Sequence, residues 1–362
     1  MENIKTTQTM FENALADRGN TAKIKRVFEK AKRGEKITVG CIGGSITEGA
    51  SATSADKQYA SLLCEWFKKR FPKAEIELVN AGVGATGSVI ATGRIDSMLL
   101  SKKPDFVLME FAVNDQASEK TGLEAYESNI RRILKSENNP ALILMFMCIN
   151  TGDNRAAIQM PLGRHYSLPL ISYRDAVWNE MQKNMFEWSD IAPDFVHPND
   201  TGHQIAADIV THFLESAYED TSSETEIDLP KPIFQNRFEN AKTYDNENLI
   251  SVSNNGFEKL DNAYPHFKNG WKASGENSEI EFSIDCSVLS IVYKCLASVK
   301  GGSVKVTIDD GDEFLISSDF SGGFGDYPAY FQVVSDKEKK QRKIKIAYQN
   351  DGEFVLLHFI SD

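Results

Sequence analysis

Short apolar runs alternate with segments of helical periodicity through the first 220 residues of the chain. In the helical segments, hydrophobic residues recur every three or four positions, as they do on one face of a helix. Continuous apolar runs are typical of strands that are buried on both faces, and their alternation with helices is typical of a parallel sheet. The pattern therefore predicts an α/β domain with strands at Ile37–Ile42, Ile76–Val79, Phe106–Phe111, Ala141–Cys148 and Leu168–Ser172.

The chain changes character at residues 221–232, which are acidic, rich in serine and threonine, and include two prolines. Such a composition is typical of a linker. After it, short alternating runs separated by turn clusters replace the helical pattern, which predicts an antiparallel β-sandwich. We therefore expect an α/β domain over residues 1–220, a linker over 221–232 and a β-sandwich domain over 233–362. The expected strands include Glu279–Ile284, Val288–Tyr293, Ser303–Ile308, Tyr330–Val334, Arg342–Tyr348 and Phe354–Phe359.

The net charge limits the kinds of partner. The 52 acidic side chains outnumber the 40 basic ones, which gives a net charge of −12 at pH 7. A surface of this sign repels nucleic acids and anionic membranes, so we expect neither as a partner.

The five cysteines are scattered and odd in number, which is typical of free thiols in a reducing compartment. Because the amino-terminal stretch also lacks the apolar run of a signal peptide, we expect a cytoplasmic protein.

A serine follows one of the predicted strands directly. The apolar run Ile37–Ile42 breaks into Gly43 and Gly44, and Ser45 comes next. Because the carboxyl ends of parallel strands meet where ligands bind, this serine is a candidate nucleophile. A serine hydroxyl is a weak nucleophile until a base takes its proton, and histidine has a suitable pKa.

His197 is the best candidate for that base, because a carboxylate stands three residues before it in a predicted loop. Asp194 at this spacing can hydrogen bond the second ring nitrogen and stabilise the charged ring. His203 is the reserve candidate. The oxyanion of an acyl-transfer reaction also needs hydrogen-bond donors. Asn114 follows a predicted strand and offers a side-chain amide, and the backbone N–H groups of Ser45 and of either Gly84 or Ala85 offer two more.

With these residues assembled, the chain resembles the SGNH (GDSL-type) hydrolase superfamily. The resemblance covers roughly residues 35–215. It implies a flavodoxin-like three-layer fold, Ser45 as nucleophile, His197 as general base and Asp194 as its partner. It also implies an oxyanion hole from the Ser45 N–H, the glycine block, with Gly84 as the preferred donor, and Asn114. Its four blocks occur in order as Gly43-Gly44-Ser45, Asn80-Ala81-Gly82-Val83-Gly84-Ala85-Thr86-Gly87, Ala112-Val113-Asn114-Asp115 and Asp194-Phe195-Val196-His197.

Three positions depart from the family pattern. Gly44 replaces the usual aspartate before the serine, and Ala112 replaces the usual glycine before the asparagine motif. In the second block, the usual glycine position can fall on Ala85. This departure leaves open whether Gly84 or Ala85 donates to the oxyanion, since a backbone N–H serves equally from either residue.

The two-domain arrangement resembles bacterial carbohydrate esterases that deacetylate mannan or xylan, with a carbohydrate-binding jelly roll as second domain. The resemblance implies a serine esterase that removes O-acetyl groups from hemicellulose oligosaccharides, with no metal or organic cofactor. Two alternatives stay open: a lipid or acyl-thioester hydrolase, and an inactive carbohydrate-binding protein. Aromatic faces stack on sugar rings, so Trp271 and Tyr327 are the expected substrate-binding residues. Further candidates are Tyr264, Phe267, Phe320, Phe324 and Tyr330.

Overall fold

The computed structural model describes residues 4–115, 120–349 and 352–362. The chain divides into two compact units. The first comprises Met1–Ala91 and Ile95–Asn236, and the second comprises Thr92–Arg94 and Arg237–Asp362. Each unit has its own sheet and its own hydrophobic core.

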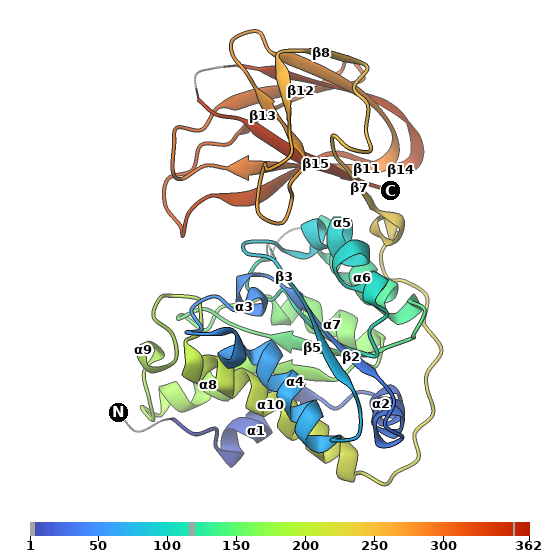
Figure 1. The fold of residues 1–362 in the computed structure, drawn as a ribbon, viewed down its shortest axis with the longest axis vertical. Helices are drawn as coiled ribbons and strands as arrows, with labels where there is room; N and C mark the ends of the chain where they lie inside the picture. The colour runs from blue at the N-terminus through green and yellow to red at the C-terminus, as the bar shows by residue number, and fades with distance from the viewer. Residues whose placement is uncertain (1–3, 116–119, 350–351) are drawn as a thin grey trace. The chain divides into compact units, whose positions relative to one another are not determined.

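The first unit is built on a six-stranded sheet (Figure 1). The strand order is β1-β6-β5-β4-β2-β3, in which β1 is antiparallel to β6 and the other neighbours are parallel. All five strands expected from the sequence are present, whereas the edge strand β1 was not expected because its three residues carry too short a pattern. The strands are β1 (Leu15–Asp17), β2 (Ile37–Gly43), β3 (Ile76–Gly82), β4 (Phe106–Glu110), β5 (Ala141–Phe146) and β6 (Leu170–Ser172).

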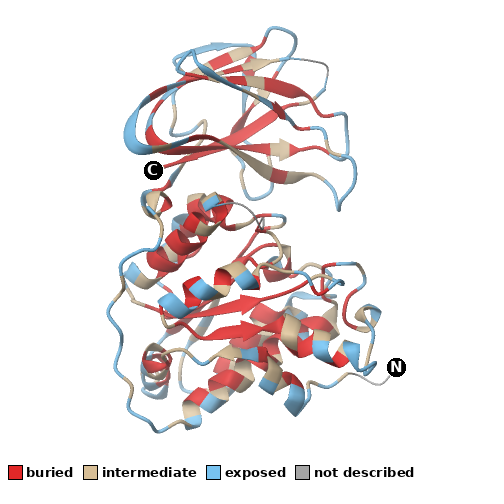
Figure 2. Ribbon diagram, turned by 180° about the vertical axis from the view of Figure 1, so that it is seen from behind, coloured by how far each residue is buried: buried red, intermediate tan, exposed pale blue. Residues whose placement is uncertain are grey.

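Helices cover both faces of this sheet, and successive strand residues point to opposite faces. Cys41 and Leu108 therefore enter the core under α1, α2, α4, α8 and α10, whereas Ile42 and Met109 enter the core under α5, α6 and α7. Figure 2 shows the central strands as a buried layer. The helices are α1 (Gln8–Ala14), α2 (Ala22–Lys32), α3 (Ser45–Glu48), α4 (Tyr59–Arg70), α5 (Ser88–Met98), α6 (Lys120–Lys135), α7 (Ala156–His165), α8 (Tyr173–Gln182), α9 (Trp188–Ile191) and α10 (Asp200–Glu219).

The second unit is an antiparallel β-sandwich of nine strands. Their order is β13-β12-β14-β11-β15-β10-β9, with β7 paired to β15 and β8 paired to β11. The strands are β7 (Lys242–Tyr244), β8 (Ser253–Asn255), β9 (Phe257–Leu260), β10 (Gly270–Ala273), β11 (Glu279–Cys295), β12 (Ser303–Ile308), β13 (Asp312–Ser317), β14 (Tyr327–Tyr348) and β15 (Val355–Ser361). The expected α/β domain followed by a β-sandwich is confirmed.

Two pairs of runs that we expected to be separate strands are continuous. Glu279–Ile284 and Val288–Tyr293 both lie in β11, where the register shifts between Cys286 and Val288. Cys286 pairs with Lys340 but Val288 pairs with Ser335, so residues 336–339 of β14 are skipped, and the alternation is interrupted without ending either strand. Tyr330–Val334 and Arg342–Tyr348 likewise lie in β14, which pairs with β11 along most of its length. The prediction of strand ends at these points was wrong.

The segment after α10 is held against the first unit by polar contacts. Arg18 pairs with both Asp220 and Glu224. Further on, the buried carboxylate of Glu127 accepts hydrogen bonds from the N–H groups of Ile233 (2.7 Å) and Phe234 (2.8 Å). These contacts place residues 233–236 in the first unit, whereas the sequence placed the start of the second domain at 233.

All five cysteines are buried and free. Within residues 4–115, 120–349 and 352–362, no helix combines the length and the apolar character needed to cross a membrane. The same residues contain no cluster of three or more histidine, cysteine, aspartate or glutamate side chains arranged to bind a metal ion.

Candidate active site

Ser45 lies at the first position of α3, directly beyond the carboxyl end of the buried strand β2. Two glycines bring the backbone close to its neighbours at this turn. A Cβ on Gly43 would lie 2.0 Å from the Thr47 Oγ1, and a Cβ on Gly44 would lie 2.1 Å from the Asn114 Oδ1. The absence of a side chain at Gly44 therefore lets the Asn114 amide approach the residue before Ser45. The family's aspartate could not stand here without displacing Asn114.

A hydrogen-bonded chain joins Ser45, His197 and Asp194, as expected from the sequence. The His197 Nε2 lies 2.9 Å from the Ser45 Oγ, and the His197 Nδ1 lies 2.9 Å from the Asp194 Oδ2. The His197 side chain is 10% exposed and the Asp194 side chain 24% exposed. This arrangement allows the imidazole to accept the serine proton while the carboxylate orients the ring and stabilises its positive charge.

The Asp194 carboxylate is held as an anion. Its Oδ1 accepts the N–H groups of Val196 and His197, each at 2.7 Å. Partial burial raises the pKa of Asp194, but these backbone hydrogen bonds and the His197 ring outweigh it, so the pKa lies below its usual value. The Trp188 Nε1 donates to the Asp194 carbonyl oxygen (2.6 Å) and so anchors the loop.

His203, the reserve candidate for the base, has a different place in the structure. It is completely buried in α10. Its Nδ1 accepts the N–H of Tyr59 (3.3 Å), and its Nε2 faces the carbonyl oxygen of Ala50 (3.1 Å), a pattern that fits a neutral ring protonated at Nε2. Burial lowers the pKa of His203, which favours the same neutral form. His203 therefore links α4, α10 and the loop after α3 rather than acting on Ser45.

Asn114 lies in the turn after β4, and its neighbour Asp115 ties this turn to two helices. The Asp115 carboxylate accepts the N–H (2.7 Å) and the hydroxyl (2.6 Å) of Ser88, at the start of α5, and the Nε2 of Gln159 (2.8 Å), in α7. The Arg155 Nε donates to the Asp115 carbonyl oxygen (2.7 Å). A role for Asp115 was not evident from the sequence, since its partners come from distant parts of the chain.

The turn after β3 does not offer the expected donor. The Gly84 N–H donates to the Glu48 Oε2 (2.8 Å), so it is already engaged. Within the described residues, the Ala85 N–H has no hydrogen-bond partner, and Ala85 has a φ of +57°, where glycine is favoured. The structure therefore favours Ala85 over the expected Gly84 as the second backbone donor. The family pattern commonly has glycine at this position. That glycine is the signal in the sequence that could have identified Ala85, but the sequence pattern left the choice between Gly84 and Ala85 open.

Comparisons with known proteins identify the family of the chain. The sequence model of the GDSL-like lipase/acylhydrolase family matches residues 41–205. The solved structure of a two-domain esterase (CEX) active on acetylated mannans is 30% identical and covers 97% of this chain and 98% of its own, with a TM-score of 0.92. The chain belongs to the GDSL-like lipase/acylhydrolase family. This membership confirms the family resemblance and the expectation of an ester hydrolase.

Two further structures are similar to this acylhydrolase. The same esterase co-crystallised with mannopentaose is 29% identical, and the match covers 98% of both chains with a TM-score of 0.92. An acetylxylan esterase from Geobacillus stearothermophilus is 21% identical over 49% of this chain and 94% of its own, with a TM-score of 0.41. No curated protein sequence matches the chain significantly.

Of the two expected sugar-binding residues in the second unit of this acylhydrolase, one is in the core. Trp271 is completely buried in β10 and packs against Phe282 and Phe359, so its ring cannot stack on a sugar. This prediction was wrong because β10 lies between β9 and β15, where an aromatic residue fills the core. Tyr327 is half-buried, with its ring 4.9 Å from that of Phe320. Phe324, between them in sequence, is 63% exposed.

The histidine loop of the acylhydrolase also carries an exposed aromatic residue that the sequence pattern does not single out. Phe195 lies between Asp194 and His197 in sequence and is 52% exposed, whereas His197 is buried. Its backbone is fixed, because the Phe195 carbonyl oxygen accepts the N–H of Asn150 (2.9 Å). Exposure of a large ring is a tertiary property that a residue pattern does not reveal.

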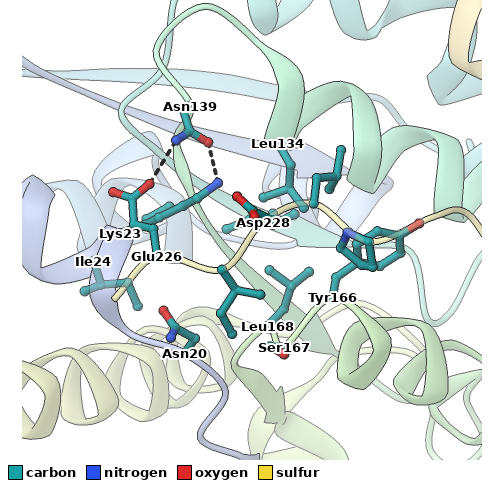
Figure 3. A pocket seen from close by; sticks show the side chains of 15 residues that line it. Asn20, Lys23, Ile24, Leu134, Asn139, Tyr166, Ser167, Leu168, Glu226 and Asp228 are labelled. Atoms are coloured by element: carbon teal, nitrogen blue, oxygen red, sulfur yellow. Dashed lines mark hydrogen bonds between the residues drawn. The ribbon is translucent and has the colours of Figure 1, made fainter. Parts of the chain in front are cut away.

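A cavity of about 240 Å³ in the first unit lies away from the Ser45 side of the sheet. It is lined by Ala141, where β5 begins, and by Leu168, just before β6, and is bordered by residues 226–230. Figure 3 shows hydrogen bonds joining the side chains of Lys23, Asn139 and Glu226 at this cavity. Ser45 and Asn114 follow the carboxyl ends of their strands, so this cavity at the amino ends is separate from the acyl-transfer site.

The buried side chain of Glu110 stabilises the turn that contains Asn114. Glu110, the last residue of β4, is completely buried, and its Oε1 accepts the N–H of Ala112 (2.8 Å). Within the described residues its Oε2 has no hydrogen-bond partner. Burial raises the pKa of Glu110 to about 8, so the carboxyl group is largely protonated at neutral pH.

Replacing Glu110 by glutamine should remove one contribution to the pH dependence of the unfolding free energy. The folded state of the wild type holds this proton up to a pH of about 8, whereas the unfolded chain releases it near the ordinary glutamate pKa of 4.5. Wild-type stability therefore falls as pH rises through this window, by about 3 to 5 kcal/mol in total. Glutamine does not titrate, so the difference in unfolding free energy between Glu110→Gln and wild type should shift in favour of the variant by that amount between pH 4.5 and 9. Urea unfolding at several pH values measures this difference in unfolding free energy. A difference that does not change with pH would contradict the inference that Glu110 is buried in its neutral form.

Proposed function

We propose that this chain is a serine esterase that removes O-acetyl groups from mannan-type oligosaccharides. The observation that carries the catalytic part of the proposal is the hydrogen-bonded chain from Ser45 through His197 to Asp194. In this proposal Ser45 is the nucleophile, His197 the general base and Asp194 its orienting partner. The Ser45 N–H, the Ala85 N–H and the Asn114 amide bind the oxyanion.

The reaction proceeds in two halves. The Ser45 Oγ attacks the acetyl carbonyl carbon while the His197 Nε2 takes the hydroxyl proton, and the carbonyl oxygen becomes an oxyanion. As the tetrahedral intermediate collapses, the bond to the sugar oxygen breaks and His197 returns the proton to that oxygen, which leaves an acetyl-enzyme. A water molecule then attacks the acetyl-enzyme with His197 as base again, and the second intermediate releases acetate and restores Ser45.

The proposal that the substrate is an acetylated sugar is supported by the similarity over the whole chain to an esterase active on acetylated mannans. Because the match covers both units, it includes the β-sandwich as well as the α/β unit. The acetylxylan esterase match covers only 49% of this chain, so it adds no support for xylan. We also propose a cytoplasmic location, because five buried free thiols suit a reducing compartment.

Acetate release tests the substrate. Acetylated glucomannan oligosaccharides, acetylated xylan oligosaccharides and a long-chain acyl ester are incubated separately with the wild type. We expect acetate from the mannan-type substrate at the highest kcat/KM. Faster hydrolysis of the long-chain ester would favour a lipid hydrolase, and binding of mannan oligosaccharides without turnover of any ester would favour an inactive binding protein.

Tyr327→Ala tests a role for the second unit in binding sugar. Since an aromatic ring that stacks on a sugar ring contributes mainly to binding, the KM for acetylated mannan oligosaccharides should rise about tenfold, with kcat on 4-nitrophenyl acetate unchanged. Ile250→Ala is the control, because Ile250 is an exposed apolar side chain of the same unit that has no ring. An unchanged KM for the oligosaccharide would mean that Tyr327 does not bind the sugar.

A further inference from the structure

The leaving alcohol of the proposed reaction has to lie beside His197. Besides the Ser45 Oγ, the tetrahedral intermediate carries two oxygen atoms, the oxyanion and the oxygen of the sugar. The sugar oxygen leaves with a proton from the His197 Nε2, which is 2.9 Å from the Ser45 Oγ. A general acid must be within hydrogen-bond distance of the atom that it protonates. The sugar therefore lies next to the loop that contains His197.

Phe195 belongs to this loop, and its backbone is fixed. The Phe195 carbonyl oxygen accepts the N–H of Asn150 (2.9 Å), four residues after the end of β5. Because β5, β4 and β2 are successive parallel strands, this contact lies at the same edge of the sheet as Ser45. Two residues of extended chain span at most about 7 Å, so the Cα atom of Phe195 is no farther than that from the Cα atom of His197.

The Phe195 ring is exposed at this place. Phe195 is 52% exposed, whereas the three residues that follow it, Val196, His197 and Pro198, are buried. Isolated apolar side chains are common on protein surfaces, so exposure alone does not identify a binding residue. Here, however, the ring is attached to a fixed backbone two residues from the catalytic base, where the leaving sugar has to lie. A flat apolar face can pack there against the C–H groups of a sugar ring.

We propose that Phe195 is a specificity-determining residue on whose ring the acetyl-bearing sugar of the substrate stacks. The proposal rests on the proposed esterase function. It places the sugar on the His197 side of Ser45, and Phe195 itself takes no part in making or breaking bonds. The expected consequence is a preference for acetyl esters of cyclic sugars over acetyl esters of open-chain alcohols.

The test compares Phe195→Ala, Phe195→Leu and Phe195→Tyr on acetylated glucomannan oligosaccharides and on ethyl acetate, whose alcohol has no ring. We expect Phe195→Ala to raise the KM for the oligosaccharides about five- to tenfold with little change in kcat, because stacking contributes equally to the ground state and the transition state. Leucine keeps an apolar side chain but not the flat face, so it should raise KM as much. Tyrosine keeps the ring and should match the wild type.

Ethyl acetate distinguishes sugar binding from a role in shaping the catalytic loop. In all three variants, kcat/KM for this ester should change less than about twofold, since stacking on a sugar contributes nothing to it. Met185→Ala is the control and should match the wild type on both substrates, because Met185 is a 65% exposed apolar side chain of the same unit without a ring. Equal losses on both substrates in Phe195→Ala, or a wild-type KM for the oligosaccharides in Phe195→Ala or Phe195→Leu, would overturn the proposal.

Binding measurements give a readout that does not depend on turnover. Calorimetry with acetylated glucomannan oligosaccharides should give a Kd about five- to tenfold higher for Ser45→Ala/Phe195→Ala than for Ser45→Ala. An equal Kd, or no binding to either variant, would overturn Phe195 as a sugar-binding residue. Failure of the proposed function has a different signature, since a wild type that hydrolyses no ester would refute the esterase itself. In that case the difference in Kd still decides the role of Phe195.

Discussion

Replacing Ser45 by alanine is expected to lower kcat about 10⁶-fold, because no other atom then occupies the position of the nucleophile. The Ser45 Oγ is within hydrogen-bond distance of the His197 Nε2, and alanine leaves the base without a proton to accept. The loss should appear equally on acetylated oligosaccharides and on 4-nitrophenyl acetate, since both need the same attack. Initial rates at high enzyme concentration measure it.

Ser54→Ala is the matched control for this loss. Ser54 is an exposed serine in the loop after α3, and its hydroxyl bonds to Asp56 (2.6 Å) rather than to a ring nitrogen. Its replacement should leave kcat at the wild-type value. Thermal unfolding of both variants verifies that they are folded. A folded Ser45→Ala enzyme that retains more than a few per cent of the wild-type rate would refute Ser45 as the nucleophile.

Asp194→Asn is expected to lower kcat about 10⁴-fold, the effect of holding the base in the wrong tautomer. The Asp194 Oδ1 accepts two backbone N–H groups, those of Val196 and His197, so the asparagine oxygen should take that place. Its NH₂ group then faces the His197 Nδ1 and donates to it. The ring proton is thereby placed on Nε2, the atom that must accept the serine proton.

The measurement is kcat on 4-nitrophenyl acetate, with Asp56→Asn as control. Asp56 is exposed, and its carboxylate bonds to the Ser54 hydroxyl. The double variant Ser45→Ala/Asp194→Asn should be no slower than Ser45→Ala alone, because residues that act as a unit are not additive. A loss below about tenfold in Asp194→Asn would mean that another group orients His197.

Much of the site was visible in the sequence because each catalytic candidate follows a pattern that is local. Gly43-Gly44-Ser45 ends an apolar run, and Asp194 and His197 are three residues apart in one loop. Parallel strands bring their carboxyl ends to one edge, which predicts that the loops of Ser45 and Asn114 meet. The loop of Asp194 and His197 joins α9 to α10, so only the tertiary structure brings it to that edge. The hydrogen bonds among Ser45, His197 and Asp194 agree with that expectation.

The errors lie where the outcome depends on neighbours in space. Trp271 follows Asn269 and Gly270, which suggests a loop, yet β10 is paired on both sides and the ring is buried. The runs within β11 resemble two strands because the register shift between Cys286 and Val288 breaks the period of two on which strand prediction rests. The edge strand β1 has only three residues, too few to show any period.

The sequence by itself determined the order of the layers, the place of Ser45 at the end of β2 and the pairing of Asp194 with His197, because apolar period and loop spacing are properties of neighbouring residues. Only the tertiary structure decided that Gly84 is bound to Glu48, that Gly44 leaves room for Asn114 and that Trp271 is buried. Each of these depends on a contact between atoms that the chain path brings together. Periodicity specifies which face of an element is buried, but not which side chain or backbone group it meets there.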